Sequence, residues 1–186
     1  MSLSKISIYD MSNSSCYMLE LAYMICQMLE YVEKQDVKKQ KEEGIPLLAT
    51  YVGAWKCQEK GVMQKYGPFL LTEIGPLNEG VILDTCLLYD FEFFRLKKQY
   101  NEFTQSYNEY VILAQSNKER QKLIERIKND EILKDPNLEE FKIIDSVVAN
   151  MGKNNLFKSK EIETYWKSEL DKLNKQLMRK TQSIII

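Results

Sequence analysis

The amino-acid sequence predicts an all-α protein, built as an antiparallel helical hairpin with long flanking helices. Glycine and proline are scarce, with 7 and 4 residues among 186, which favours long helices over a strand-rich fold with many turns. Hydrophobic residues make up 44% of the chain and charged residues 28%, so a sizeable core can form. Apolar side chains also recur mostly at the three- and four-residue spacings of a helix. The length suggests one domain with appendages.

Two helices are expected in the first third of the chain. The first covers about residues 15–43, because Ser15 offers an N-cap and Gly44 a C-terminal stop. Its first half is apolar on most sides, so it is either a core helix or a helix that packs against another chain. Pro46 begins a second helix that ends near Gly61. The loop that follows contains two Gly-Pro steps, Gly67-Pro68 and Gly75-Pro76.

The middle of the chain is expected to be helical as well. Apolar and aromatic side chains recur at spacings of three or four over about residues 77–114, which predicts one long helix there. The capping-box pattern Ser116-x-x-Glu119 then begins another helix, which runs towards residue 133.

Two further helices are expected at the C-terminal end. Asp135-Pro136 caps a helix that ends at Gly152, and the last helix covers about residues 159–179. One face of the last helix carries an apolar seam with coiled-coil-like spacing, which we expect to pack on this chain or on a neighbour rather than to form a free dimer. Its members are Ile162, Trp166, Leu170, Leu173 and Leu177. The chain thus divides into an N-terminal helical extension (1–44), a hairpin region (45–134) and C-terminal helices (135–186).

Charge and composition disfavour several classes of function. The formal net charge is −1 and the isoelectric point about 5.8, whereas nucleic-acid binders need a basic face. Histidine is absent, which removes the commonest general base and metal ligand. No glycine-rich phosphate loop occurs. The carboxylate pairs Glu42-Glu43 and Glu139-Glu140 lie in charged helical stretches, where solvated helix faces are expected. We therefore expect no catalytic residue, no cofactor and no metal.

No membrane span or cleaved targeting segment is expected. The most apolar run, residues 16–32, is short for a bilayer and contains Glu20 and Glu30. Residues 1–13 have neither an apolar signal core nor an Arg-rich presequence.

The four cysteines are Cys16, Cys26, Cys57 and Cys86. No Cys-x-x-Cys spacing occurs, so zinc and iron–sulfur sites are not expected. Cys57 lies ten residues before Gly67 and Cys86 ten residues after Pro76. In a helical hairpin this symmetry would place the two thiols opposite each other, as a disulfide requires. The alternative is two unrelated buried thiols. Cys16 and Cys26 would be about 15 Å apart on one helix and could not bond to each other.

Residues 46–95 contain a set of motifs at defined spacings: Pro46-Leu47-Leu48-Ala49, Gly53-Ala54, Cys57, Leu77-x-Glu79-Gly80-x5-Cys86 and Phe93-Phe94-Arg95. This set resembles the motifs of a known family, the alpha-subcomplex subunit 8 family of mitochondrial respiratory complex I, NADH:ubiquinone oxidoreductase. That family has paired Cys-x9-Cys helical hairpins of the coiled-coil-helix-coiled-coil-helix (CHCH) type. Here Gly67 and Pro76 replace the inner cysteine pair, and residues 100–133 contain no cysteine. The resemblance therefore implies a degenerate CHCH-like hairpin.

The resemblance implies a non-catalytic accessory subunit of complex I on the intermembrane-space side of the mitochondrial inner membrane. Such a subunit supports the assembly and stability of the membrane arm. It implies a structural Cys57–Cys86 disulfide and partners that are other subunits of the complex. It also implies peripheral membrane association, with no redox centre, nucleic acid or small-molecule substrate. The apolar tail, residues 184–186, is either a docking site or a frayed end.

Two alternatives remain open from the sequence. One is a free helical adaptor or inhibitor module that binds a protein partner, which predicts reduced cysteines. The other is an enzyme that uses carboxylates or tyrosine, which requires a cleft where titratable groups converge.

Overall fold

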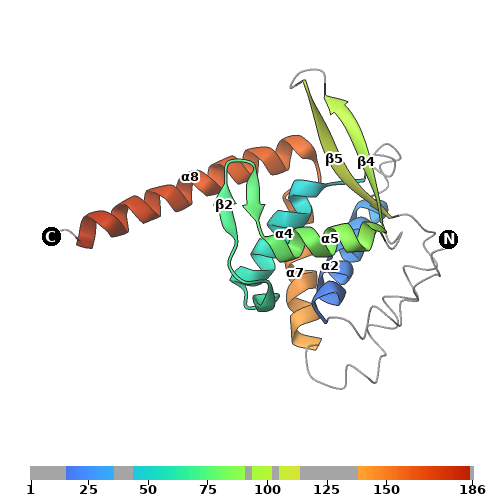
Figure 1. Ribbon diagram of the computed structural model, residues 1–186, viewed down its shortest axis with the longest axis horizontal. Helices are drawn as coiled ribbons and strands as arrows, with labels where there is room; N and C mark the ends of the chain where they lie inside the picture. The colour runs from blue at the N-terminus through green and yellow to red at the C-terminus, as the bar shows by residue number, and fades with distance from the viewer. Residues whose placement is uncertain (1–15, 36–43, 91–93, 102–104, 114–137, 185–186) are drawn as a thin grey trace.

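A computed structural model describes residues 16–35, 44–90, 94–101, 105–113 and 138–184. Most of this part of the chain is helical, as Figure 1 shows, and the prediction of a mainly helical fold is confirmed. The helices are α2 (Cys16–Lys34), α4 (Leu47–Glu59), α5 (Glu79–Asp90), α7 (Leu138–Lys153) and α8 (Ser159–Ile184). A short 3-10 helix, η1 (Gln64–Tyr66), lies between α4 and α5.

The fold is not all-α, because two small antiparallel sheets accompany the helices. One sheet has the strand order β1-β5-β4, and the other pairs β2 with β3. The strands are β1 (Ile45–Pro46), β2 (Leu70–Thr72), β3 (Gly75–Leu77), β4 (Phe94–Asn101) and β5 (Ser106–Leu113).

The long helix predicted over residues 77–114 is wrong beyond Asp90, because β4 and β5 form a hairpin there. From Phe94 to Lys97 apolar and basic residues alternate, and burial alternates with them, with Phe94 buried and Arg95 exposed. This is the two-residue period of a strand. The aromatic residues that suggested a helix also favour strands. One aromatic pair, Tyr100 and Tyr107, occupies directly opposite positions in the hairpin.

The loop with two Gly-Pro steps contains the small hairpin β2–β3. Leu70 pairs with Leu77 and Thr72 with Gly75, so residues 73 and 74 form the turn. Gly75 has a φ of +149°, a conformation that favours glycine. A Cβ at this position would lie 2.7 Å from Leu48 Cδ1 on α4. Glycine therefore lets the hairpin approach the start of α4 closely.

The predicted antiparallel pairing of the second helix with the long helix is not confirmed. α5 packs mainly on α2 and β4. Its start is fixed by Asn78, whose side-chain oxygen accepts a hydrogen bond from the Val81 N–H at 3.1 Å. The Asn78 amide nitrogen donates to the Tyr66 carbonyl at 2.7 Å, which fastens the preceding loop to the helix start.

α2 is the central helix of the core. From Leu21 to Met28 nearly every side chain is buried, so the core-helix alternative holds for this segment. α7 packs along it, and the Tyr23 hydroxyl donates to Asp145 on α7 at 2.9 Å. α4 and α5 cover other sides of α2. The predicted continuation of this helix over residues 36–43 lies outside the described residues.

The remaining predicted helices have different outcomes. α4 begins directly after Pro46 and ends at Glu59, as expected. α7 and α8 confirm the two C-terminal helices, although α8 continues to Ile184. α7 ends at Lys153, one residue beyond the predicted end at Gly152, and Gly152 itself is buried. The helix predicted over residues 116–133 lies outside the described residues.

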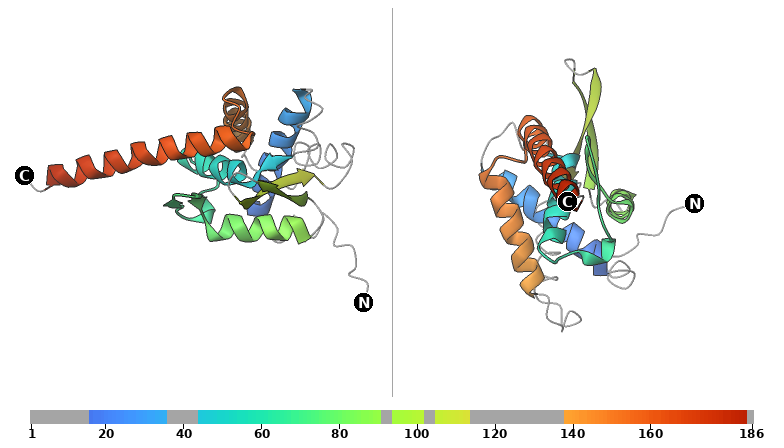
Figure 2. Two further views of the ribbon diagram at one scale, coloured as in Figure 1. Left: turned by 90° about the horizontal axis from the view of Figure 1, so that it is seen from above. Right: turned by 90° about the vertical axis from the view of Figure 1, so that its left-hand side faces the viewer.

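α8 has one half on the body of the molecule and one half that projects from it. Its first turns pack on α4, and its second half extends away from the other elements in the left view of Figure 2. Ile162 and Trp166 are buried in the first half, whereas Leu177 is 61% exposed in the second.

Candidate functional site

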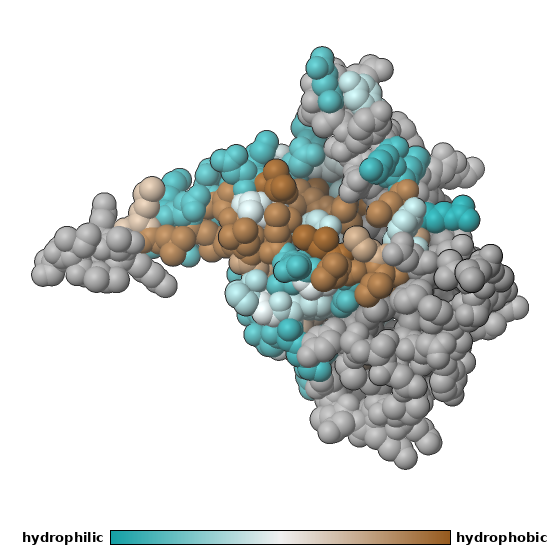
Figure 3. All heavy atoms as spheres, in the orientation of Figure 1, coloured by the Kyte–Doolittle hydropathy of each residue, from teal (hydrophilic) through white to brown (hydrophobic). Residues whose placement is uncertain are grey.

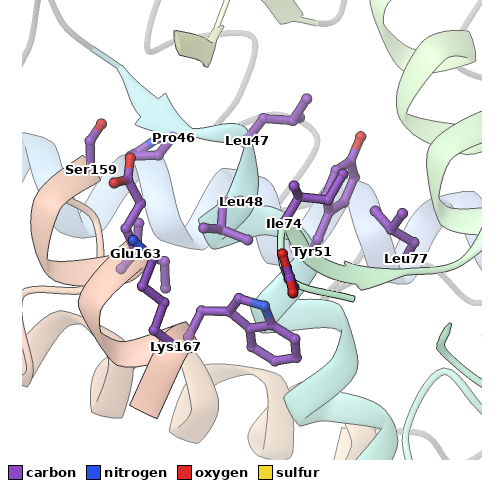
Figure 4. A pocket seen from close by; sticks show the side chains of 12 residues that line it. Pro46, Leu47, Leu48, Tyr51, Ile74, Leu77, Ser159, Glu163 and Lys167 are labelled. Carbon is purple, nitrogen blue, oxygen red and sulfur yellow. The ribbon is translucent and has the colours of Figure 1, made fainter. Parts of the chain in front are cut away.

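A cavity of about 490 Å³ lies between the start of α4, the β2–β3 turn and the first turns of α8. Figure 4 shows Leu48 and Tyr51 from α4, Ile74 from the turn and Lys167 from α8 around this space. Three sequence-distant segments build it, so the local sequence gives little indication of it. Most of its lining is apolar, from Leu47, Leu48, Tyr51, Ile74, Ile162 and Trp166.

Trp166 provides a rigid wall of the cavity. Its indole Nε1–H donates to the Thr72 carbonyl oxygen at 2.8 Å, which fastens α8 to the β2–β3 hairpin. The ring of Trp55 meets it edge to face, with centroids 5.3 Å apart. Only 1% of the Trp166 side chain is exposed. A wall that is already ordered loses little conformational entropy when a ligand binds.

A cation supports the tryptophan pair from the α4 side. Lys56 Nζ lies 4.4 Å from the ring centroid of Trp55 and forms an ion pair with Glu59 at 3.1 Å. Burial alone would lower the pKa of Lys56, but hydrogen bonds to Tyr165 and Glu59 outweigh it and raise that pKa. Lys56 therefore stays charged beside the ring at physiological pH.

The rim of the cavity carries exposed charged side chains. They are Glu73 from the turn and Glu163 and Lys167 from α8. Ile74, also on the turn, is 75% exposed. An apolar cavity of this kind can bind an apolar group, and the charged side chains at its rim can orient the polar groups attached to it.

A second cluster of interest is a pair of carboxyl groups at the contact of α2 and α7. Burial raises the pKa of Glu20 from 4.5 to about 7, and hydrogen bonding and charge repulsion from Glu140 act in the same direction. Lys65 opposes these effects. The Oε2 atoms of both glutamates are buried and have no hydrogen-bond partner among the described residues. Burial and the neighbouring Glu140 carboxylate therefore both favour the protonated form of Glu20.

The Glu20–Glu140 pair corrects part of the sequence-based interpretation. Glu139 is exposed and pairs with Lys142 at 2.9 Å, as expected of a solvated helix face. Glu140 turns towards α2 instead and is half-buried. The pair Glu42-Glu43 lies outside the described residues. The sequence signal for the buried pair was Glu20 itself, which is a lone carboxylate in an apolar run.

Glu20 should make stability depend on pH. Because the fold raises its pKa from 4.5 to about 7, its stabilising effect is complete below pH 4.5 and is lost as the pH rises through 7. Glu20→Gln keeps a neutral hydrogen-bonding group at every pH. At pH 8 we expect the free energy of unfolding of this variant to be about 1–2 kcal/mol higher than that of the wild type. Urea unfolding at pH 5 and pH 8 measures the difference.

Glu139→Gln is the matched control, because Glu139 is exposed on the same helix as Glu140. Its stability should differ from that of the wild type by no more than about 0.5 kcal/mol at either pH. A Glu20→Gln variant that loses as much stability between pH 5 and pH 8 as the wild type would contradict the raised pKa of Glu20.

The predicted Cys57–Cys86 disulfide is absent from the structure, where both residues are free thiols. Cys57 is buried on α4, and its thiol donates to Met24 Sδ at 3.9 Å. Burial raises the pKa of Cys57 to about 12, so it is protonated and unreactive. Cys86 is exposed on α5. The symmetry argument required α5 to pair with α4, whereas α5 packs on α2 and β4.

The other cysteines give no site either. Cys26 is a buried cysteine on α2, and the side chain of Cys16 lies outside the described residues. Within the described ranges, no three metal-ligating side chains gather at one place. In the same part of the chain, none of the helices combines the length and apolarity that crossing a membrane would need.

Comparison with protein-family models, curated proteins and solved structures gives no match for this chain.

Proposed function

We propose that this protein is a non-catalytic structural or adaptor subunit that acts by binding another protein. The observation that carries the proposal is the apolar cavity beside α8. Its wall at Trp166 is fully buried and held by a hydrogen bond to Thr72, while Ile74 projects at its rim. Preformed apolar hollows beside exposed apolar side chains are where partner proteins insert anchoring residues.

The surface around the cavity supports a protein partner. Figure 3 shows apolar surface that runs from α8 across the middle of the body. Exposed apolar side chains contribute to it from the hairpin, with Leu70 and Ile74, and from α5, with Leu83 and Leu87. Extended apolar surface of this kind marks interaction sites. A small-molecule site would instead enclose its ligand and direct several polar groups into the cavity.

The more specific proposal, an accessory subunit of mitochondrial complex I, stays a prediction, together with its intermembrane-space location. It depended on a helical hairpin with a Cys57–Cys86 disulfide, and the thiols of these residues are free and lie in different surroundings. Free thiols were the expectation for the adaptor alternative. The geometry therefore favours the broader proposal of a protein-binding subunit.

The experiment is purification of the tagged protein from its native cells under mild conditions, with the bound partner quantified by mass spectrometry. Ile74→Glu places a charge at the rim of the cavity and should reduce the recovered partner at least about tenfold, which corresponds to about 1.4 kcal/mol. Tyr89→Glu is the control, because Tyr89 is an exposed apolar residue on α5 outside the cavity. Wild-type protein that elutes as a monomer with no stoichiometric partner would contradict the proposal.

A further inference from the structure

The contact between α2 and α7 contains two carboxyl groups at one of its ends. Glu20 lies just beyond the first turn of α2, and Glu140 lies in the first turn of α7. The two helices run parallel, since Glu20 lies beside Glu140 and Tyr31 lies beside Gly152 farther along. Figure 1 shows α7 next to α2 in the body of the molecule. The two glutamates therefore face each other where both helices begin.

Glu20 occupies a position that suits an uncharged carboxyl group better than a charged one. The residue is 7% exposed, and its Oε2 atom is buried without a hydrogen-bond partner among the described residues. The Oε2 atom of Glu140 is buried in the same way. A protonated carboxyl group can donate to a neighbouring carboxylate, whereas two carboxylates can only accept hydrogen bonds. Protonation of Glu20 therefore turns a repulsive contact into an attractive one.

The groups that face Glu20 from the neighbouring elements do not reverse this preference. Lys65 on η1 lowers the pKa of Glu20, but burial and Glu140 on α7 outweigh it. Cys57 on α4 senses the charge of Glu20, and burial keeps this thiol protonated. The first turn of a helix favours a negative charge, and Glu140 occupies that place in α7. Glu20 is thus the member of the pair that binds the proton.

The first turns of α7 have few other contacts that hold them against α2. Of the described side chains in residues 139–143, none is fully buried, whereas Ile144 is. Tyr23 on α2 makes two contacts here, with the Phe141 ring at a centroid distance of 4.7 Å and with the Asp145 carboxylate. Burial raises the pKa of the Tyr23 hydroxyl, so it keeps its proton between pH 5 and pH 8. The glutamate pair is therefore the contact that responds to pH at this end.

The opposite end of the same contact is held by packing that does not involve charge. The Tyr31 ring fills the space beside Gly152 and packs edge to face on Phe157, with centroids 5.6 Å apart. Val148 and Met151 of α7 are buried there. The first turns of α7 can therefore separate from α2 while the rest of the helix stays in place.

We propose that Glu20 and Glu140 form a proton-operated latch, which closes the first turns of α7 on α2 in acid and releases them when the proton is lost. The loss of stability with rising pH then originates in one local unit of the fold. The latch is independent of the proposed binding function, because none of the residues that line the cavity belongs to α2 or α7.

Amide hydrogen exchange, resolved by residue with NMR, tests the latch. Residues 142–146 carry the first amides of α7 with helical hydrogen-bond partners. After correction for the intrinsic effect of pH on exchange, their protection factors should be at least about tenfold lower at pH 8 than at pH 5. At pH 8 they should also exchange by a route that low concentrations of urea do not accelerate, unlike the amides of residues 149–153. Protection factors and urea dependence that are the same in both segments would mean global unfolding and would overturn the proposal.

Three variants assign the effect to the glutamate pair. Glu20→Gln should give residues 142–146 the same protection at pH 5 and pH 8, within about twofold. Glu139→Gln is the matched control and should follow the wild type, because Glu139 is exposed. Tyr23→Phe removes the hydrogen bond to Asp145, so it should lower protection at both pH values by a similar factor and leave the pH effect intact.

Circular dichroism at pH 5 establishes that each variant is folded before exchange is compared. A Glu20→Gln variant with the full pH dependence of the wild type would overturn the proposal. So would a wild-type protein whose protection in residues 142–146 is equal at pH 5 and pH 8.

Discussion

Replacing Trp166 with alanine is expected to lower the free energy of unfolding by about 3–5 kcal/mol. The side chain is 1% exposed, its ring packs edge to face on Trp55, and its indole N–H donates to the Thr72 carbonyl. Alanine would leave a cavity, a Trp55 ring without this aromatic contact and a carbonyl without this donor. Urea unfolding followed by tryptophan fluorescence or circular dichroism measures the loss.

Two variants separate packing from hydrogen bonding at this position. Trp166→Phe keeps an aromatic ring but removes the indole donor, so it should cost less than the alanine variant. Met178→Ala is the control on the same helix, because Met178 is 68% exposed, and it should change stability by no more than about 0.5 kcal/mol. A Trp166→Ala cost no larger than that of Met178→Ala would mean that α8 is not held by this contact.

Replacing Gly152 with alanine is expected to destabilise the protein by about 1–3 kcal/mol. Gly152 lies in the last turn of α7 and is buried. A Cβ at this position would overlap the ring of Tyr31 on α2. That ring also packs edge to face on Phe157, with centroids 5.6 Å apart, and so has little freedom to move. Thermal unfolding measures the change.

A double-mutant cycle tests the cause of this cost. Tyr31→Ala removes the ring that the new methyl group would overlap. In the Tyr31→Ala background, Gly152→Ala should therefore lose its penalty and become neutral or stabilising. A Gly152→Ala variant with a raised melting temperature in the wild-type background would contradict the close contact of α2 and α7.

Local sequence was sufficient where the determinants of a helix end lie within a few residues. Pro46 immediately precedes α4, and Asp135-Pro136 comes shortly before the start of α7. Proline marks such starts because it is tolerated at the beginning of a helix but breaks a helix interior. The seam from Ile162 to Leu177 likewise predicted α8. It gave no indication that only the first half of the seam would be covered.

Other features depended on contacts between distant residues. The spacing of the aromatic residues after Asp90 is compatible with a helix or a strand. The strand forms because β4 and β5 pair with each other as an antiparallel hairpin. Cys57 and Cys86 were symmetric about the loop, but α5 packed on α2 and β4 rather than on α4. Gly152 predicted the end of α7 to within one residue, but only its contact with the Tyr31 ring shows why a residue without a Cβ is needed there.

Local sequence patterns predicted correctly that this protein is mainly helical, with an apolar N-terminal helix and a C-terminal helix that carries an apolar seam. Periodicity and capping are local, and they act before the chain is compact. The positions of the sheets, the burial of Glu20 beside Glu140 and the cavity beside Trp166 follow from tertiary packing. Each of these depends on residues that are far apart in the chain, and long-range packing, rather than local propensity, brings them together.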